Sequence, residues 1–139
     1  ASIQYMITSG CTASTQYAYA EMLRLSCEGV INFVEDTKAY AERARRMKKI
    51  FCDNGFTITY PRDVTEEIGD GFFFSLSYPG MTGGELVSEL ISYGVSSINL
   101  DTTGSLEHGV RACTSRMRDE LYPVLEERMK MFRLDHPLP

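Results

Sequence analysis

The sequence predicts an α+β fold: a small, mainly antiparallel sheet of about four short strands with helices packed on one face, preceded by N-terminal helices. Apolar residues recur at helical spacing through the first third of the chain and again near its end, whereas four short β-prone stretches lie between. The resulting order is helix, helix, strand, strand, helix, strand, strand, helix. The length of 139 residues suits one domain of ordinary size.

Two helices are predicted at the N-terminal end. The first covers residues 12–28, and Gly29 stops or bends it. The second covers residues 32–54 and ends at Asn54-Gly55. We therefore divide the chain into an N-terminal helical segment, residues 1–29, and a small C-terminal α+β domain, residues 30–139.

The four predicted strands cover residues 56–60, 71–78, 95–100 and 109–114, with an acidic loop at 62–70. Between the second and third strands, Thr82 and Glu85 have the spacing of a capping box, which predicts a helix running to about Tyr93. The last helix is predicted over residues 119–134. Its Pro123 is compatible with a helix if it falls in the first turn, where the missing N–H has no intrahelical partner.

Composition narrows the class of partner. The formal net charge of −5 argues against nucleic acid or an anionic membrane surface as the main partner. The basic run at residues 43–49 is interpreted as a solvated helix face. No apolar run approaches the ~18 residues of a membrane span. The four cysteines match no metal motif, which predicts free thiols in a reducing cytoplasm.

The most informative single residue is Arg111, which alternates with small and apolar residues in the last predicted strand. Period 2 places Arg111 and Cys113 on one face of that strand, and Val110 and Ala112 on the other. An arginine on the inner face of a half-buried strand is costly unless an anion meets it, and its planar fork suits a carboxylate or phosphate. The alternatives are a salt bridge to one of the 19 acidic residues and a snorkelling surface arginine.

Motifs for other chemistry are weak. The two histidines, His108 in a turn and His136 near the C-terminus, are the only candidates for a serine or cysteine triad. The glycines at residues 80–84 precede a helix and could bind an anion, but Thr82 as an N-cap explains them without a ligand. Neither a nucleophile nor a metal centre is predicted.

Several segments, taken in order, resemble the C-terminal part of class I/II aminotransferases, which are fold-type I enzymes that use pyridoxal phosphate. The quoted segments cover residues 9–16, 32–36, 72–81, 93–98, and then 102–105 with 109–115. No single segment is specific, but their order and spacing together are fairly specific. The resemblance implies that residues 1–29 belong to the end of the large domain and its connection to the small domain.

The resemblance assigns to Arg111 the bidentate pairing with the α-carboxylate of an amino acid or 2-oxo acid substrate. It also makes Ser9 and, more weakly, Ser14 candidates near the cofactor phosphate, with helix capping as the alternative role. The four lysines fit no cofactor motif. We therefore expect pyridoxal phosphate and its Schiff-base lysine in a missing large domain of the full-length enzyme. The fragment alone is expected to bind no cofactor and to be inactive.

Exposure of surface that a large domain once covered predicts a homo-oligomer. We expect Tyr5, Tyr17, Tyr19 and Leu23 to meet a second copy. Two other functions stay open. One is a small regulatory module that binds free amino acids through Arg111, and the other is a non-catalytic interaction domain in which Arg111 is salt-bridged.

Overall fold

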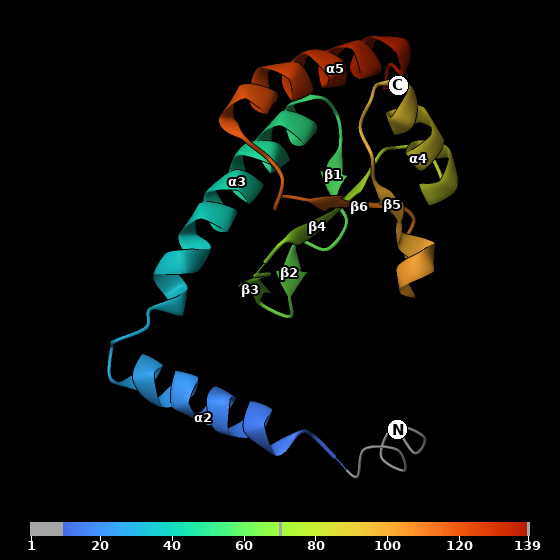
Figure 1. The fold of residues 1–139 in the computed structure, drawn as a ribbon. Helices are drawn as coiled ribbons and strands as arrows, with labels where there is room; N and C mark the ends of the chain where they lie inside the picture. Colours follow the sequence, from blue (N-terminus) through green and yellow to red (C-terminus); the bar gives the residue numbers. More distant parts are fainter. Residues whose placement is uncertain (1–9, 70, 139) are drawn as a thin grey trace. The chain divides into compact units, whose positions relative to one another are not determined.

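The computed structural model describes residues 10–69 and 71–138 and divides the chain into two compact units, residues 1–37 and 38–139. In the first unit, helix α2 (Ala13–Cys27) has no buried residue, and Arg24 forms ion pairs with Glu21 and Glu28. Helix α3 (Phe33–Asp53) begins in this unit and continues in the second (Figure 1). The domain boundary expected after residue 29 stays a prediction.

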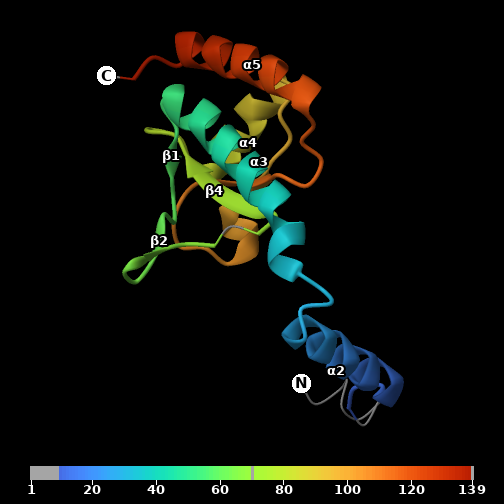
Figure 2. The same ribbon diagram turned by 90° about the vertical axis from the view of Figure 1, so that its left-hand side faces the viewer.

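The second unit contains the predicted α+β layer. Its sheet has the strand order β1-β4-β6-β5, with every neighbouring pair antiparallel. The bounds are β1 (Thr57–Ile58), β4 (Phe73–Ser77), β5 (Ile98–Asn99) and β6 (Val110–Cys113). Helices α3, α4 (Gly83–Ser92) and α5 (Tyr122–Asp135) cover one face of the sheet (Figure 2). The predicted fold class is confirmed.

The hydrophobic core lies between the sheet and these three helices. Phe74, Leu76, Val110 and Ala112 of the sheet are all less than 8 % exposed. They form one cluster with buried side chains of the helices: Ala44, Met47, Phe51, Leu86, Leu90, Leu125, Met129 and Phe132. Because all these sheet residues point to one side, the alternate residues of the same strands point to the opposite face, away from the core formed with α3, α4 and α5.

Several local predictions are confirmed, and two are refined. Thr82 and Glu85 form the capping box that opens α4, and Pro123 lies in the first turn of α5, after a short 3-10 helix η2 (Asp119–Leu121). The acidic loop contains a hairpin of β2 (Arg62–Asp63) and β3 (Glu66–Glu67). The polar turn after β5 is the 3-10 helix η1 (Leu100–Thr103).

Within residues 10–69 and 71–138, no helix combines the length and the apolar character needed to span a bilayer.

Candidate functional site

Arg111 projects from β6 on the face of the sheet that the helices leave open. Its strand neighbours Val110 and Ala112 are buried on the helix side, as period 2 predicts, and Arg111 is half-buried opposite them. The expectation that Arg111 lies on the inner face is therefore wrong, because the helices cover the other side. Across the ladder, Arg111 faces Ser75 on β4 and Ile98 on β5.

The Arg111 guanidinium has an aromatic neighbour but no anionic one in the described part of the chain. Its Cζ atom lies 4.3 Å from the centroid of the Phe73 ring. Its Nε atom is buried and has no hydrogen-bond partner. Arg111 takes part in none of the ion pairs formed among residues 10–69 and 71–138. The salt-bridge alternative thus finds no partner among these residues.

Arg111 lines an open cleft of about 470 Å³, within the range of small-molecule pockets. One wall is the chain that leads into and out of the β2–β3 hairpin, and the other is η1 with the turn after it. The described lining consists of Tyr60, Ile68, Gly69, Phe73, Phe74, Ser75, Leu100, Thr103, Gly104, Ser105 and Arg111. Arg111 is the only lysine or arginine in that set.

The two walls of the cleft are joined by a hydrogen bond between hydroxyl groups. Tyr60 Oη and Ser105 Oγ lie 2.5 Å apart. Ser105 Oγ also donates to the Glu107 carbonyl and accepts from the Glu107 N–H. Thr103 Oγ1 donates to the Leu100 carbonyl. Most side-chain polar groups of the walls are therefore already engaged, which leaves Arg111 as the group with unused donors.

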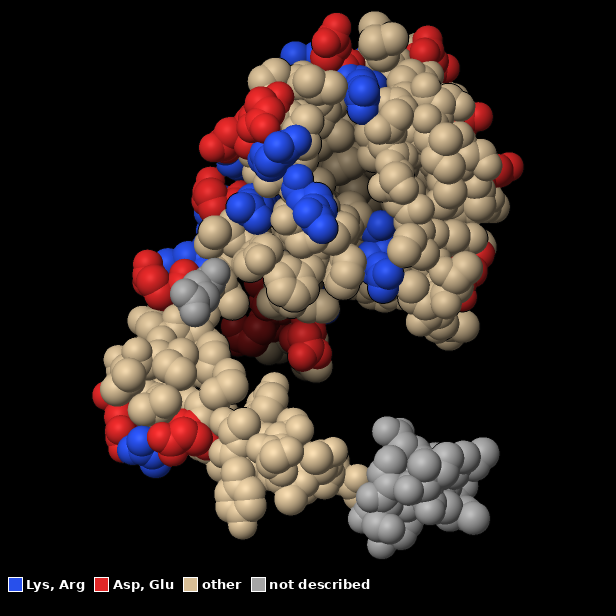
Figure 3. All heavy atoms as spheres, viewed as in Figure 1, with Lys and Arg blue, Asp and Glu red and all other residues tan. Residues whose placement is uncertain are grey.

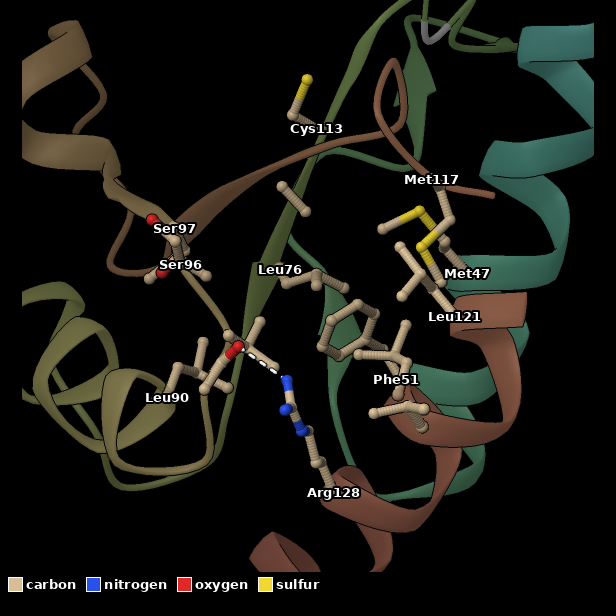
Figure 4. A pocket seen from close by; sticks show the side chains of 16 residues that line it. Met47, Phe51, Leu76, Leu90, Ser96, Ser97, Cys113, Met117, Leu121 and Arg128 are labelled. Atoms are coloured by element: carbon tan, nitrogen blue, oxygen red, sulfur yellow. Dashed lines mark hydrogen bonds between the residues drawn. The ribbon is translucent and has the colours of Figure 1, made fainter. Parts of the chain in front are cut away.

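A second cavity, of about 190 Å³, lies on the opposite, helix-covered side of the sheet (Figure 4). Apolar side chains such as Phe51, Leu76 and Met117 surround it. Its cation, Arg128, donates from Nη1 to the Gly94 carbonyl at 2.9 Å. Since that guanidinium already has an acceptor and the remaining lining is mostly apolar, this cavity is a weaker candidate for an anion site than the Arg111 cleft.

The two histidines lie at different places in the fold. His136 follows α5, with its ring 4.6 Å from that of Phe132 and its Nε2 3.3 Å from Glu89 Oε2. The sequence did not predict this ring packing, because His136 lies beyond the predicted helix over residues 119–134 and precedes Pro137. His108 lies in the turn before β6. Among the described residues, no three His, Cys, Asp or Glu side chains lie close enough together to hold a metal ion.

The remaining candidates are not among the described residues that line the cleft. Ser9 and Tyr5 fall outside them, and Ser14 is an exposed residue of α2. Lys49 and Lys130 pair with Asp53 and Glu126 one helical turn away.

The basic run at residues 43–49 is mixed with acidic partners on the surface. Arg45 pairs with Glu42, and Arg46 pairs with Asp119 at 2.7 Å while lying over the Tyr122 ring. In the view of Figure 3, basic and acidic side chains are interspersed over this part of the molecule. The run therefore contributes to several local ion pairs and to no uniform basic patch in this view.

Neither models of known protein families nor curated protein sequences match this chain significantly. The resemblance to aminotransferases thus rests only on the residues quoted for it.

Sequence reasoning missed Phe73 and Tyr60 as parts of the site. Period 2 along residues 73–77 already places Phe73 on the same face as Ser75, opposite the buried Phe74. An aromatic residue on the polar face of a strand is a signal that could have been used. Tyr60 could not be found this way, since its partner Ser105 is 45 residues away in the sequence.

Proposed function

We propose that this chain is a C-terminal fragment of a pyridoxal-phosphate-dependent aminotransferase, consisting mainly of its small domain, and that Arg111 binds the α-carboxylate of its amino acid or 2-oxo acid substrate. One observation carries the proposal: a half-buried guanidinium with no anionic partner among the described residues lines an open cleft. A charge in that position is costly without a partner, so the cleft favours an anion.

The surroundings of Arg111 suit a planar anion. The Phe73 ring packs against the guanidinium, whose Cζ atom lies 4.3 Å from the ring centroid, and this contact limits the freedom of the side chain. A carboxylate can accept two parallel hydrogen bonds from such a fork. Ser75, directly across the ladder from Arg111, offers a hydroxyl on the same face of the sheet. These groups together support carboxylate binding better than binding of an uncharged ligand.

The residues described for the cleft do not fit the cofactor itself. No lysine is among them, whereas pyridoxal phosphate is held as a Schiff base on a lysine. In this proposal the cofactor, its lysine and the rest of the substrate site belong to a large domain outside this chain. The contribution of this chain is to bind the carboxylate and to exclude water when the domains close.

The test is a titration of the 139-residue chain with pyruvate, followed by NMR at the Arg111 Nε–H signal. We expect saturable shifts of this signal and at least a tenfold weaker affinity for Arg111→Gln, about 1.4 kcal/mol or more. Arg116→Gln is the matched control, because it removes the same charge from an exposed position outside the cleft.

Two results would contradict the proposal in different ways. If pyruvate bound the Arg111→Gln variant as well as it bound the parent chain, Arg111 would not be the carboxylate site. If the chain alone bound free amino acids at micromolar concentration, the regulatory amino-acid-binding module would replace the aminotransferase domain as the best interpretation.

The predicted homo-oligomer is tested separately by light scattering over a dilution series. Tyr17, Tyr19 and Leu23 are 80 %, 62 % and 55 % exposed on α2, and only monomer at every concentration would count against it.

A further inference from the structure

We infer that the Arg111 cleft selects substrates with one carboxylate and an uncharged, apolar or aromatic side chain, and that it disfavours a second carboxylate. This inference rests on the proposed function and names the substrate class for the same site.

Exposed apolar side chains stand beside the carboxylate-binding group. Phe73, Tyr60 and Ile68 line the cleft and are 43 %, 39 % and 38 % exposed. Ile98, opposite Arg111 on β5, is 46 % exposed. Water contact with these surfaces is unfavourable, so a ligand that covers them gains affinity roughly in proportion to the apolar area buried. A substrate anchored at Arg111 by its carboxylate would have its side chain within reach of these walls.

The polar groups of the walls offer little to a charged side chain. The hydroxyl groups of Tyr60 and Ser105 bond to each other, and Thr103 Oγ1 bonds to a backbone carbonyl. Arg111 is the single cation among the described lining residues, and the α-carboxylate occupies it. A second carboxylate would therefore enter the cleft without a cationic partner, which costs its hydration free energy.

Acidic residues flank both walls. Between Tyr60 and Ile68 the β2–β3 hairpin carries Asp63, Glu66 and Glu67 against one arginine, Arg62. The hairpin is closed at its base, where the Ile68 N–H donates to the Pro61 carbonyl. Red spheres mark this acidic group in Figure 3, where Figure 1 places β2 and β3.

On the other wall, Asp101 lies in η1 and Glu107 follows Ser105. These carboxylates repel a second anionic group but leave a neutral side chain unaffected.

The experiment compares three 2-oxo acids that share the same α-carboxylate, by NMR titration of the 139-residue chain at the Arg111 Nε–H signal. Pyruvate is the reference, phenylpyruvate adds an aromatic side chain, and 2-oxoglutarate adds a second carboxylate. We expect phenylpyruvate to bind about three- to tenfold more tightly than pyruvate, the range for one aromatic contact. We expect 2-oxoglutarate to bind more weakly than pyruvate, with a larger difference at low salt.

Two variants test whether residues of the cleft walls cause these differences in affinity among the 2-oxo acids. Ile68→Ala should reduce the preference for phenylpyruvate over pyruvate, whereas Met131→Ala, which removes an exposed apolar side chain of α5, should not. Glu66→Gln should narrow the gap between 2-oxoglutarate and pyruvate. Glu127→Gln on α5 controls for a change in net charge.

The outcomes separate this inference from the proposed function. If 2-oxoglutarate bound as tightly as phenylpyruvate or more tightly, the inferred substrate class would be wrong, while Arg111 would still be a carboxylate site. If no 2-oxo acid shifted the Arg111 signal, the inference that this chain by itself selects the substrate would be overturned, whereas a carboxylate clamp that needs the large domain would not. In that case the exposed apolar walls would be better explained as a surface covered by another protein.

Discussion

The two faces of the four-stranded sheet are built from the same strands and differ in almost every physical property. On the helix-covered face, Leu76 and Val110 are fully buried and form part of one continuous core. On the open face, Arg111 is half-buried without an anionic partner among the described residues, beside Phe73 at 43 % exposure. Because alternate residues point to opposite sides, one short stretch of sequence serves both faces.

The helix-covered face stabilises the fold, whereas the open face carries the candidate binding site. The core face excludes water and brings together side chains from three helices, so its residues stabilise the fold. The open face keeps a cation and several apolar side chains uncovered, which is unfavourable for an isolated domain. Substitutions on the two faces should therefore have different consequences, and four experiments test that.

The largest effect is expected for a pair of adjacent phenylalanines on opposite faces of β4. Phe74→Ala should lower the free energy of unfolding by about 3–5 kcal/mol, because its ring is 4 % exposed and packs near Phe51. Phe73→Ala should cost about 1 kcal/mol or less, because much of its ring already contacts water. Urea unfolding of both variants measures the difference, and equal losses would mean that the open face is packed like the core.

A second comparison tests how closely α4 approaches the sheet. A Cβ atom on Gly83 would lie 2.1 Å from Asn99 Oδ1 and 2.6 Å from the Gly109 carbonyl oxygen. Gly83→Ala should therefore destabilise the protein by about 1–3 kcal/mol. Gly84→Ala is the matched control, since its nearest such atom is 3.9 Å away and alanine favours a helix. If both substitutions were neutral in urea unfolding, this close packing would not exist in solution.

The sequence predicted features that depend on local order and missed those that depend on distant partners. Alternation over residues 110–113 correctly separated the two faces of β6, although it did not show which face the helices cover, and the Thr82–Glu85 spacing predicted the start of α4. Both follow from backbone periodicity or from a contact within one helical turn. The strands proved shorter than predicted, because their ends are set by pairing with neighbouring strands.

Local sequence patterns did not predict the β2–β3 hairpin or the walls of the cleft. The β2–β3 hairpin pairs Arg62 with Glu67 and has no apolar alternation to reveal its strands. The packing of Arg111 against Phe73 depends on the register between β4 and β6. The role of Arg111 as a carboxylate-binding residue stays a prediction, although its place in a cleft agrees with it.

A third experiment compares two arginines in different surroundings. Arg111→Met should change the free energy of unfolding by only about 0.5 kcal/mol, because it breaks no described ion pair and relieves a buried Nε atom without a partner. Arg46→Met should cost more, about 1 kcal/mol, since Arg46 stacks 3.6 Å from the Tyr122 ring centroid and pairs with Asp119. Thermal or urea unfolding gives both values. A large loss for Arg111→Met would indicate a structural ion pair and favour the interaction-domain alternative.

The smallest effect concerns Glu85, a charge that, unlike Arg111, is satisfied within the chain. The Thr82 backbone N–H donates to Glu85 Oε2 at 2.8 Å and the Thr82 hydroxyl donates at 2.7 Å, which together lower the pKa of Glu85. Folding thus favours the ionised carboxylate. Its contribution to stability is fully present above the unfolded pKa, about 4.3, and is lost as the pH falls through the lower folded value.

Glu85→Gln can keep the hydrogen bond of the capping box but removes the charge. Urea midpoints for the parent chain and this variant should therefore differ at pH 7 and converge as the pH falls through the lowered folded pKa of Glu85. Glu127→Gln on α5 corrects for the change in net charge. If the difference stayed constant from pH 7 to 3, the cap would act through its hydrogen bonds alone. In that case Glu85 would not be a charged counterpart of Arg111, which has no anionic partner among the described residues.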